Sequence, residues 1–101
     1  MASHSVARSK HATLSAATVD TITITGLYCN FRVQNRASTG TISYTYGATT
    51  AATPTADGDD TFDLPAGATD EWTEEILGAP ATGRVVKLIS AATPAYSVEA
   101  Y

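Results

Sequence analysis

From Val19 to Tyr101 the chain repeats one short pattern. Short runs alternate apolar side chains with Thr, Ser or charged ones, and each run ends at Gly, Pro, Asn or Asp, with no helical stretch between. Side chains at every second position line one face of a β-strand, and the residues that end the runs are those that favour turns. The pattern therefore predicts an all-β fold, a small sandwich or barrel.

Seven segments fit the strand pattern. Residues 84–90, RVVKLIS, are apolar on both faces, which indicates a central place in a sheet. Residues 69–77 fit two patterns, because Trp72 and Ile76 are spaced as on a helix, while their length favours a strand. The expected strands are 19–25, 27–34, 41–46, 61–64, 69–77, 84–90 and 95–101. About seven antiparallel strands predict one small β-sandwich, Ig-like or jelly-roll-like.

The large apolar residues that could fill the core of a 101-residue chain are few. A domain of this size buries about two thirds of the surface that its unfolded chain exposes. The lone Cys29 alternates in phase with Phe31 and Val33, so we expect it inside as a small filler rather than as a reactive thiol. The expected core residues are Leu14, Ile22, Ile24, Leu27, Phe31, Ile42, Phe62, Leu64, Trp72, Ile76, Leu77, Leu88 and Ile89.

Residues 1–18 differ in composition from the rest of the chain. They are rich in Ser, Ala and Thr, with Val6 and Leu14 as the only sizeable apolar groups. A segment of this composition does not fold alone. We therefore predict an extended N-terminal arm over 1–18 and a sandwich domain over 19–101. The arm residues expected to bind a partner are Val6, Arg8, Lys10, His11 and Leu14.

Charge is separated along the sequence, although charged residues are only 16% of the chain and the net charge is -4. Residues 1–36 hold four Lys or Arg against Asp20 alone, whereas residues 57–75 hold eight carboxylates and no Lys or Arg. Such a molecule has a basic part and an acidic part, which can steer side-by-side association of copies. Two solvated faces without a partner are the alternative.

The sequence carries no recognisable catalytic constellation. His4 and His11 both lie in the predicted arm, away from the acidic segment, so neither a zinc site nor a Ser-His-Asp arrangement is supported. The Asp residues of 57–63 could offer oxygen ligands to Ca²⁺, but their spacing favours a solvated acidic turn. We expect no enzyme activity, no catalytic residues, no metal and no cofactor.

Two binding functions compete at the level of composition. Trp72 and several Tyr residues could form platforms for sugars, although each also has a place in a core. Nucleic-acid binding is opposed by the acidic balance. No run approaches the length of a membrane span, and no secretory signal is recognised. We therefore expect no nucleic-acid, membrane or small-molecule partner, while a carbohydrate-binding β-sandwich module stays an alternative.

The run of segments FRVQNRASTGTISYTYG, TFDLPAGATDEW, RVVKLIS and AYSVEAY, within residues 31–101, resembles small β-sandwich virion proteins of tailed bacteriophages, especially those of actinobacterial hosts. The resemblance implies a head decoration or minor capsid protein, made in the host cytoplasm and located on the phage head surface. It implies the major capsid protein and copies of the chain itself as partners, with a trimer as one arrangement. A tail or head-tail subunit is the alternative within this class.

Overall fold

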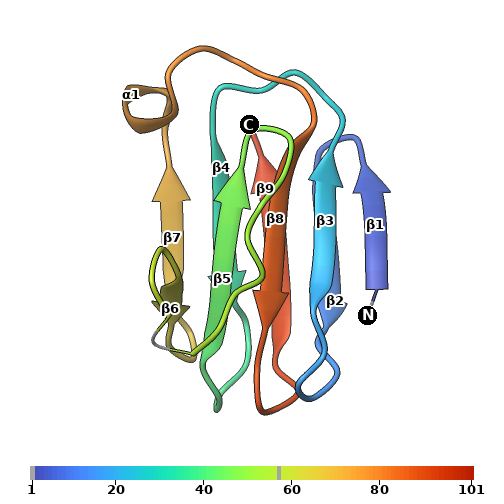
Figure 1. Cartoon of the computed structure of the whole chain (residues 1–101), viewed down its shortest axis with the longest axis vertical. Helices are drawn as coiled ribbons and strands as arrows, with labels where there is room; N and C mark the ends of the chain where they lie inside the picture. Colours follow the sequence, from blue (N-terminus) through green and yellow to red (C-terminus); the bar gives the residue numbers. More distant parts are fainter. Residues whose placement is uncertain (1, 57) are drawn as a thin grey trace.

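The computed structural model describes residues 2–56 and 58–101, which form two β-sheets packed face to face (Figure 1). The five-stranded sheet, called sheet A, has the order β1 (Ala2–Val6), β3 (Asp20–Ile24), β8 (Arg84–Ile89), β5 (Ile42–Gly47) and β6 (Phe62–Leu64). The four-stranded sheet, sheet B, has the order β2 (Ser9–Thr13), β9 (Ala95–Ala100), β4 (Phe31–Asn35) and β7 (Thr69–Trp72). The predicted all-β sandwich is confirmed.

Alternation along the strands builds the core between the sheets. In β3, Ile22 and Ile24 are buried while Thr21 and Thr23 face outward, and β4 repeats this arrangement with Phe31 and Val33 inside. Strand β8 lies between β3 and β5, which confirms the predicted central position of residues 84–90. The fully buried side chains are Leu14, Ile22, Ile24, Phe31, Val33, Ile42, Tyr44, Leu64, Val86, Leu88, Tyr96 and Val98.

Two tyrosine hydroxyls connect the sheets through the core. Tyr96 of sheet B donates to Asp20 Oδ2 of sheet A at 2.9 Å, and Tyr44 of sheet A donates to Asp70 Oδ2 of sheet B at 2.6 Å. Burial, and after it the hydrogen bond to a carboxylate, raises the pKa of each tyrosine well above its usual value. Both hydroxyls therefore stay protonated and act as donors between the layers.

The structure corrects the prediction of an extended arm over residues 1–18. Residues 2–6 form β1, which pairs with β3 in parallel, and residues 9–13 form β2, which pairs with β9 in antiparallel fashion. Leu14 then enters the core at 1% exposure. The segment has too few apolar groups to fold alone, but it folds as edge strands because the rest of the chain supplies partners for its backbone N–H and C=O groups. Residues 2–14 therefore take part in both sheets and in the core.

The predicted strands at 27–34 and 69–77 are also shorter than expected. Strand β4 begins only at Phe31, and residues 69–77 divide into β7 and one helical turn, α1 (Glu74–Leu77). The ladder between β4 and β7 ends at the pair Phe31 and Trp72, and beyond it the Asn30 side chain accepts a hydrogen bond from the Glu74 N–H at 2.8 Å. As a result Leu27 and Ile76, both expected in the core, are 65% and 61% exposed.

The long connection from β5 to β6 lies against the outer face of sheet A (Figure 1). The Thr45 hydroxyl donates to the Ala52 carbonyl, and Pro54 is buried. This cover explains why Thr45, which faces away from the core, is only 3% exposed. Of the predicted acidic turn over 57–63, Asp57 lies outside the described residues, while Asp59, Asp60 and Asp63 are exposed.

Candidate functional site

The strand order places the first residues of the basic part and the acidic part at opposite edges of the sandwich. Strands β1 and β2 form one edge, and β6 and β7 form the other (Figure 1). We call the first the basic edge; its charged or titratable residues are His4, Arg8, Lys10 and His11. We call the second, with α1 and residues 58–61, the acidic edge; its described carboxylates are Asp59, Asp60, Asp63, Asp70, Glu71, Glu74 and Glu75. Arg8 and Lys10 are therefore separated in space from the acidic edge, whereas Arg32 of the basic part lies in β4, opposite Glu71 of β7.

The residues predicted to bind a partner lie on the basic edge, but several already contact their own chain. Val6 packs against the core cluster, and Leu14 belongs to it. The Arg8 Nε donates to the Ala100 carbonyl at 3.0 Å. Lys10 is opposite the inward-facing Val98 in the β2–β9 register and is half-buried. Of the five, Arg8 and His11 are exposed.

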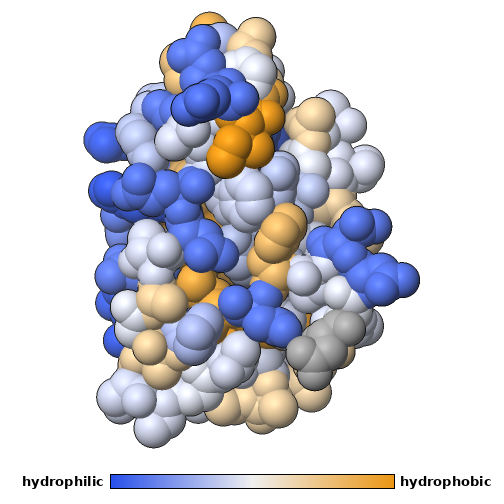
Figure 2. Space-filling model, turned by 90° about the vertical axis from the view of Figure 1, so that its left-hand side faces the viewer, coloured by the Kyte–Doolittle hydropathy of each residue, from blue (hydrophilic) through white to orange (hydrophobic). Residues whose placement is uncertain are grey.

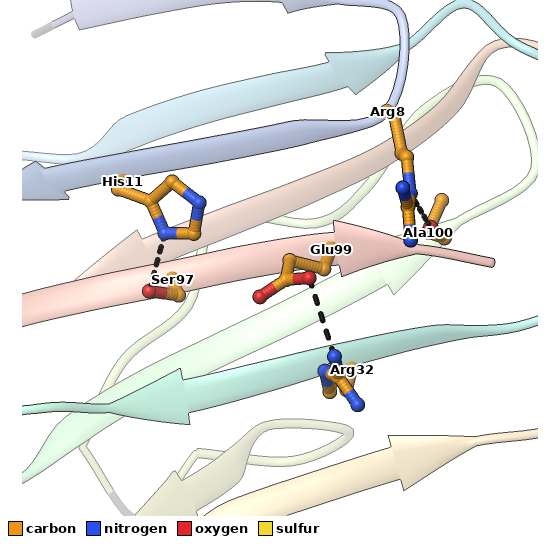
Figure 3. A network of polar contacts seen from close by, with 6 residues as sticks. All are labelled: Arg8, His11, Arg32, Ser97, Glu99 and Ala100. Carbon is orange, nitrogen blue, oxygen red and sulfur yellow. Dashed lines mark hydrogen bonds and ion pairs between the residues drawn. The ribbon is translucent and has the colours of Figure 1, made fainter.

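The outer face of sheet B carries a polar network next to this edge (Figure 3). The His11 Nδ1 lies 2.7 Å from the Ser97 hydroxyl, and the Arg32 guanidinium forms an ion pair with Glu99 at 3.2 Å. The Arg32 guanidinium also lies over the Tyr101 ring, 5.3 Å from its centroid. Within residues 2–56 and 58–101, Arg32 with Glu99 is the one ion pair, so most charges on both edges remain solvated.

The contact between His11 and Ser97 resembles part of a nucleophilic pair. Catalysis would require an accessible hydroxyl and donors placed to stabilise an oxyanion. Ser97, however, is only 3% exposed, and it lies on the outer face of a sheet. The two cavities described below include neither residue. The contact therefore fixes β2 against β9 and supplies no reaction site; sequence reasoning missed it because the two residues are 86 positions apart.

Aromatic side chains fill the space between the sheets on the side of the acidic edge. Trp72 lies 4.6 Å from Tyr46, 4.7 Å from Phe62 and 6.4 Å from Phe31, measured between ring centroids. Its indole N–H donates to the Tyr44 hydroxyl at 2.9 Å. Trp72 is half-buried and enclosed by three other rings, so it closes the core more than it offers a free face to a ligand.

Figure 2 shows this side of the molecule, where hydrophilic side chains lie around several small apolar areas. The half-buried Phe62 and Trp72 and the exposed Ile76 belong to this side, and the carboxylates of the acidic edge surround them. Apolar groups with carboxylates around them would fit a partner surface that offers apolar contact and positive charge.

Two hollows lie near opposite ends of the sandwich. A groove of about 750 Å³ lies at the end that carries the connections 14–19 and 90–94, and small side chains including Ala17, Ala56 and Ala92 line most of it. A smaller hollow of about 230 Å³ lies beside α1, where the buried Arg84 donates to the Tyr28 and Ala79 carbonyls at 2.8 and 3.0 Å. Arg84 thus ties two loops together.

The structure also bears on three other features considered from the sequence: the lone cysteine, a metal site and a membrane-spanning segment. Cys29 is half-buried, in the loop before β4 rather than in a strand. Among residues 2–56 and 58–101, no three His, Cys, Asp or Glu side chains are grouped as a metal site requires. In the same part of the chain, no helix has the length and apolar character to span a membrane.

Comparison with protein-family models gave no match, and comparison with curated proteins gave none either. Among solved structures, the chain is similar to the pre-peptidase C-terminal domain of collagenase from Bacillus anthracis. The TM-score is 0.44 and the sequence identity 9%, over 99% of this chain and 93% of that one. A similarity at this level does not extend to binding or activity.

Proposed function

We propose that this chain is a non-enzymatic virion structural protein, a head decoration or minor capsid protein that binds and stabilises a lattice of major capsid protein. The observation that carries the proposal is the placement of Arg8 and Lys10 at one edge of the sandwich and of the acidic cluster at the opposite edge. A domain of this shape can lie between neighbours and meet a positive surface on one side and a negative surface on the other. The resemblance of residues 31–101 to virion proteins supplies the setting.

Such a role needs no chemistry. Each copy would add a modest contact area to the lattice, and many copies on one shell would hold adjacent subunits together by multivalency. Low overall charge favours this role, because few ions must be desolvated where the faces touch neighbours. The partner of the acidic edge would be a surface with Lys or Arg around an apolar centre.

Two alternatives differ in partner. A tail or head-tail subunit would use the same edges against a different virion protein. A carbohydrate-binding module would instead use the half-buried aromatic rings of Phe62 and Trp72 with nearby carboxylates as hydrogen-bond acceptors for sugar hydroxyls. The enclosure of Trp72 by three rings disfavours the sugar site.

Co-sedimentation tests the proposal. The purified protein is sedimented alone and with assembled shells of the major capsid protein from the same genome. We expect it to sediment with the shells at a fixed ratio, and the bound fraction to fall as salt is raised, since the contact is electrostatic.

Variants assign the contact to the acidic edge. The triple variant Glu71→Gln, Glu74→Gln and Glu75→Gln should bind less than the unchanged protein. Lys87→Gln, on the outer face of the central strand β8, is the matched control and should bind normally. A protein that ignores the shells at low salt refutes the capsid role, and quenching of Trp72 fluorescence by soluble glycans would then support the sugar-binding alternative.

A further inference from the structure

Residues 2–14 are attached to the rest of the domain mainly through backbone pairing. Strand β1 matches five residues of β3 and β2 matches five residues of β9. No residue of β1 or β2 is buried, and Leu14 is the one buried side chain between residues 2 and 19. The segment thus lies on two sheet edges and is anchored mainly by Leu14, with Val6 and Ala12 packed against the core as partly buried side chains.

Outside the strand pairing, few hydrogen bonds that involve side chains join this segment to the rest of the chain. Arg8 donates to the Ala100 carbonyl, His11 meets Ser97, and the Thr25 hydroxyl donates to the Val6 carbonyl at 3.2 Å. Every partner lies in or next to β3 or β9. A second copy of the chain offers the same partners in the same arrangement.

A short connection joins this segment to β3. Residues 15–19 form it, and Ser15, Ala16 and Ala17 are exposed. Ala17 has a φ of 54°, in the left-handed region that residues with a Cβ avoid. An extended connection would remove this strain, and five extended residues reach about 16 Å, enough to pass from one molecule to a neighbour.

We propose that residues 2–14 are exchanged between two copies of this chain. In the exchanged dimer, β1 and β2 of one copy pair with β3 and β9 of the other, and Leu14 enters the core of the other copy. The inference rests on the proposed structural role only for its purpose, since it gives copies a way to join. Its physical basis lies in this chain alone.

The balance between monomer and dimer follows from these contacts. Each contact of residues 2–14 is formed once per copy in either form, so the contacts themselves favour neither. Two things differ. The dimer relaxes the strain at Ala17 but loses the hydrogen bond from the Ala17 N–H to the Ser90 carbonyl at 2.7 Å, and association costs entropy, which makes the dimer depend on concentration. In the exchanged dimer, the end of one sandwich that carries residues 14–19 lies next to the same end of the other sandwich.

Intermolecular disulfide formation tests the exchange directly. In a Cys29→Ser background, one chain carries His11→Cys and a second, longer tagged chain carries Ser97→Cys. The two are unfolded together in urea, refolded at several concentrations and oxidised. The disulfide between residues 11 and 97 can join the two different chains only where β2 of one lies on β9 of the other.

We expect a covalent heterodimer on a non-reducing gel, in a fraction that rises with the concentration during refolding. The matched control pairs Arg32→Cys with Glu99→Cys in the same background, because both positions lie in strands that are not exchanged. It should yield only the low level of random collision. A heterodimer yield no greater than this control at every concentration overturns the proposal.

Variants of the connection give an independent readout in case the cysteine variants misfold. Ala17→Gly removes the strain from the monomer and should weaken the dimer roughly tenfold per connection. Ala17→Pro cannot adopt a positive φ and should strengthen the dimer. Sedimentation velocity measures both against the unchanged chain; dimer fractions that do not differ among the three refute the exchange. Failure here leaves the capsid role standing, because the shell assay measures a different contact.

Discussion

The hydrogen bond between Tyr96 and Asp20 joins the two sheets inside the core, and its loss should be large enough to measure. The Tyr96 hydroxyl lies 2.9 Å from Asp20 Oδ2, and the two residues are 0% and 5% exposed. Tyr96→Phe keeps the ring and removes the donor, which leaves a buried carboxylate with one partner fewer. A hydrogen bond to a charged acceptor of this kind contributes about 2 to 3 kcal/mol, so the free energy of unfolding should fall by that amount.

Tyr44→Phe is the informative comparison, because Tyr44 forms the second connection between the sheets. Its hydroxyl contacts Asp70 and the Trp72 indole N–H, and both of these residues are half-buried. Water can therefore replace part of what is lost. We expect a decrease of about 1 to 2 kcal/mol, smaller than that for Tyr96→Phe.

Equilibrium unfolding in urea measures both effects. The fluorescence of Trp72, the single tryptophan, reports on the core, and circular dichroism is the second probe because Tyr44→Phe changes the surroundings of Trp72. The midpoint should fall while the slope stays unchanged, since the same surface is exposed on unfolding. A loss below about 1 kcal/mol for Tyr96→Phe, or a larger loss for Tyr44→Phe, would refute the reasoning from burial.

Three further predictions follow from the same core and its turns. Folding raises the pKa values of Tyr44 and Tyr96, so the free energy of unfolding should not change with pH just below about pH 10, and above that it should fall by about 2.7 kcal/mol per pH unit. Urea titrations at several pH values measure this slope, which should be half as steep for Tyr96→Phe. Leu14→Ala should cost about 2 to 5 kcal/mol by thermal unfolding, since it empties a core position; a cost near zero would mean that Leu14 is not anchored. Gly47→Ala should destabilise much more than Gly67→Ala, because a Cβ at 47 would overlap the Thr50 carbonyl while one at 67 meets open space and costs only about 1 kcal/mol for its positive φ; equal melting temperatures would contradict this.

Alternation identified most of the sandwich because the inward and outward faces of its central strands differ in polarity. The runs around Ile22, Val33 and Leu88 were each predicted to be strands, and each forms one in the structure. The same reasoning could not place residues 2–13, because an edge strand with partly exposed side chains has no apolar face to detect. Backbone pairing with distant strands holds it, and pairing of this kind leaves little trace in local composition.

The errors at Leu27 and Ile76 have a related cause. Both are large and apolar, so their size predicted a place in the core, yet Leu27 lies in the loop before β4 and Ile76 in the helical turn α1, and both are exposed. The charge separation was visible in the sequence, but its arrangement on opposite edges depends on the strand order. The contact between His11 and Ser97 depends on it as well, because β2 and β9 become neighbours only when sheet B forms.

During synthesis, β2 is made long before its pairing partner β9. His11 and Ser97 are 86 residues apart, and a ribosome adds about 5 to 20 residues per second, so β2 exists for on the order of 10 s before β9 is made. During that interval Val6 and Leu14 have no completed core to enter. Where several ribosomes translate one message, the nearest finished β9 belongs to an older copy of the chain, so vectorial synthesis itself would bring a nascent segment and a foreign sheet edge together.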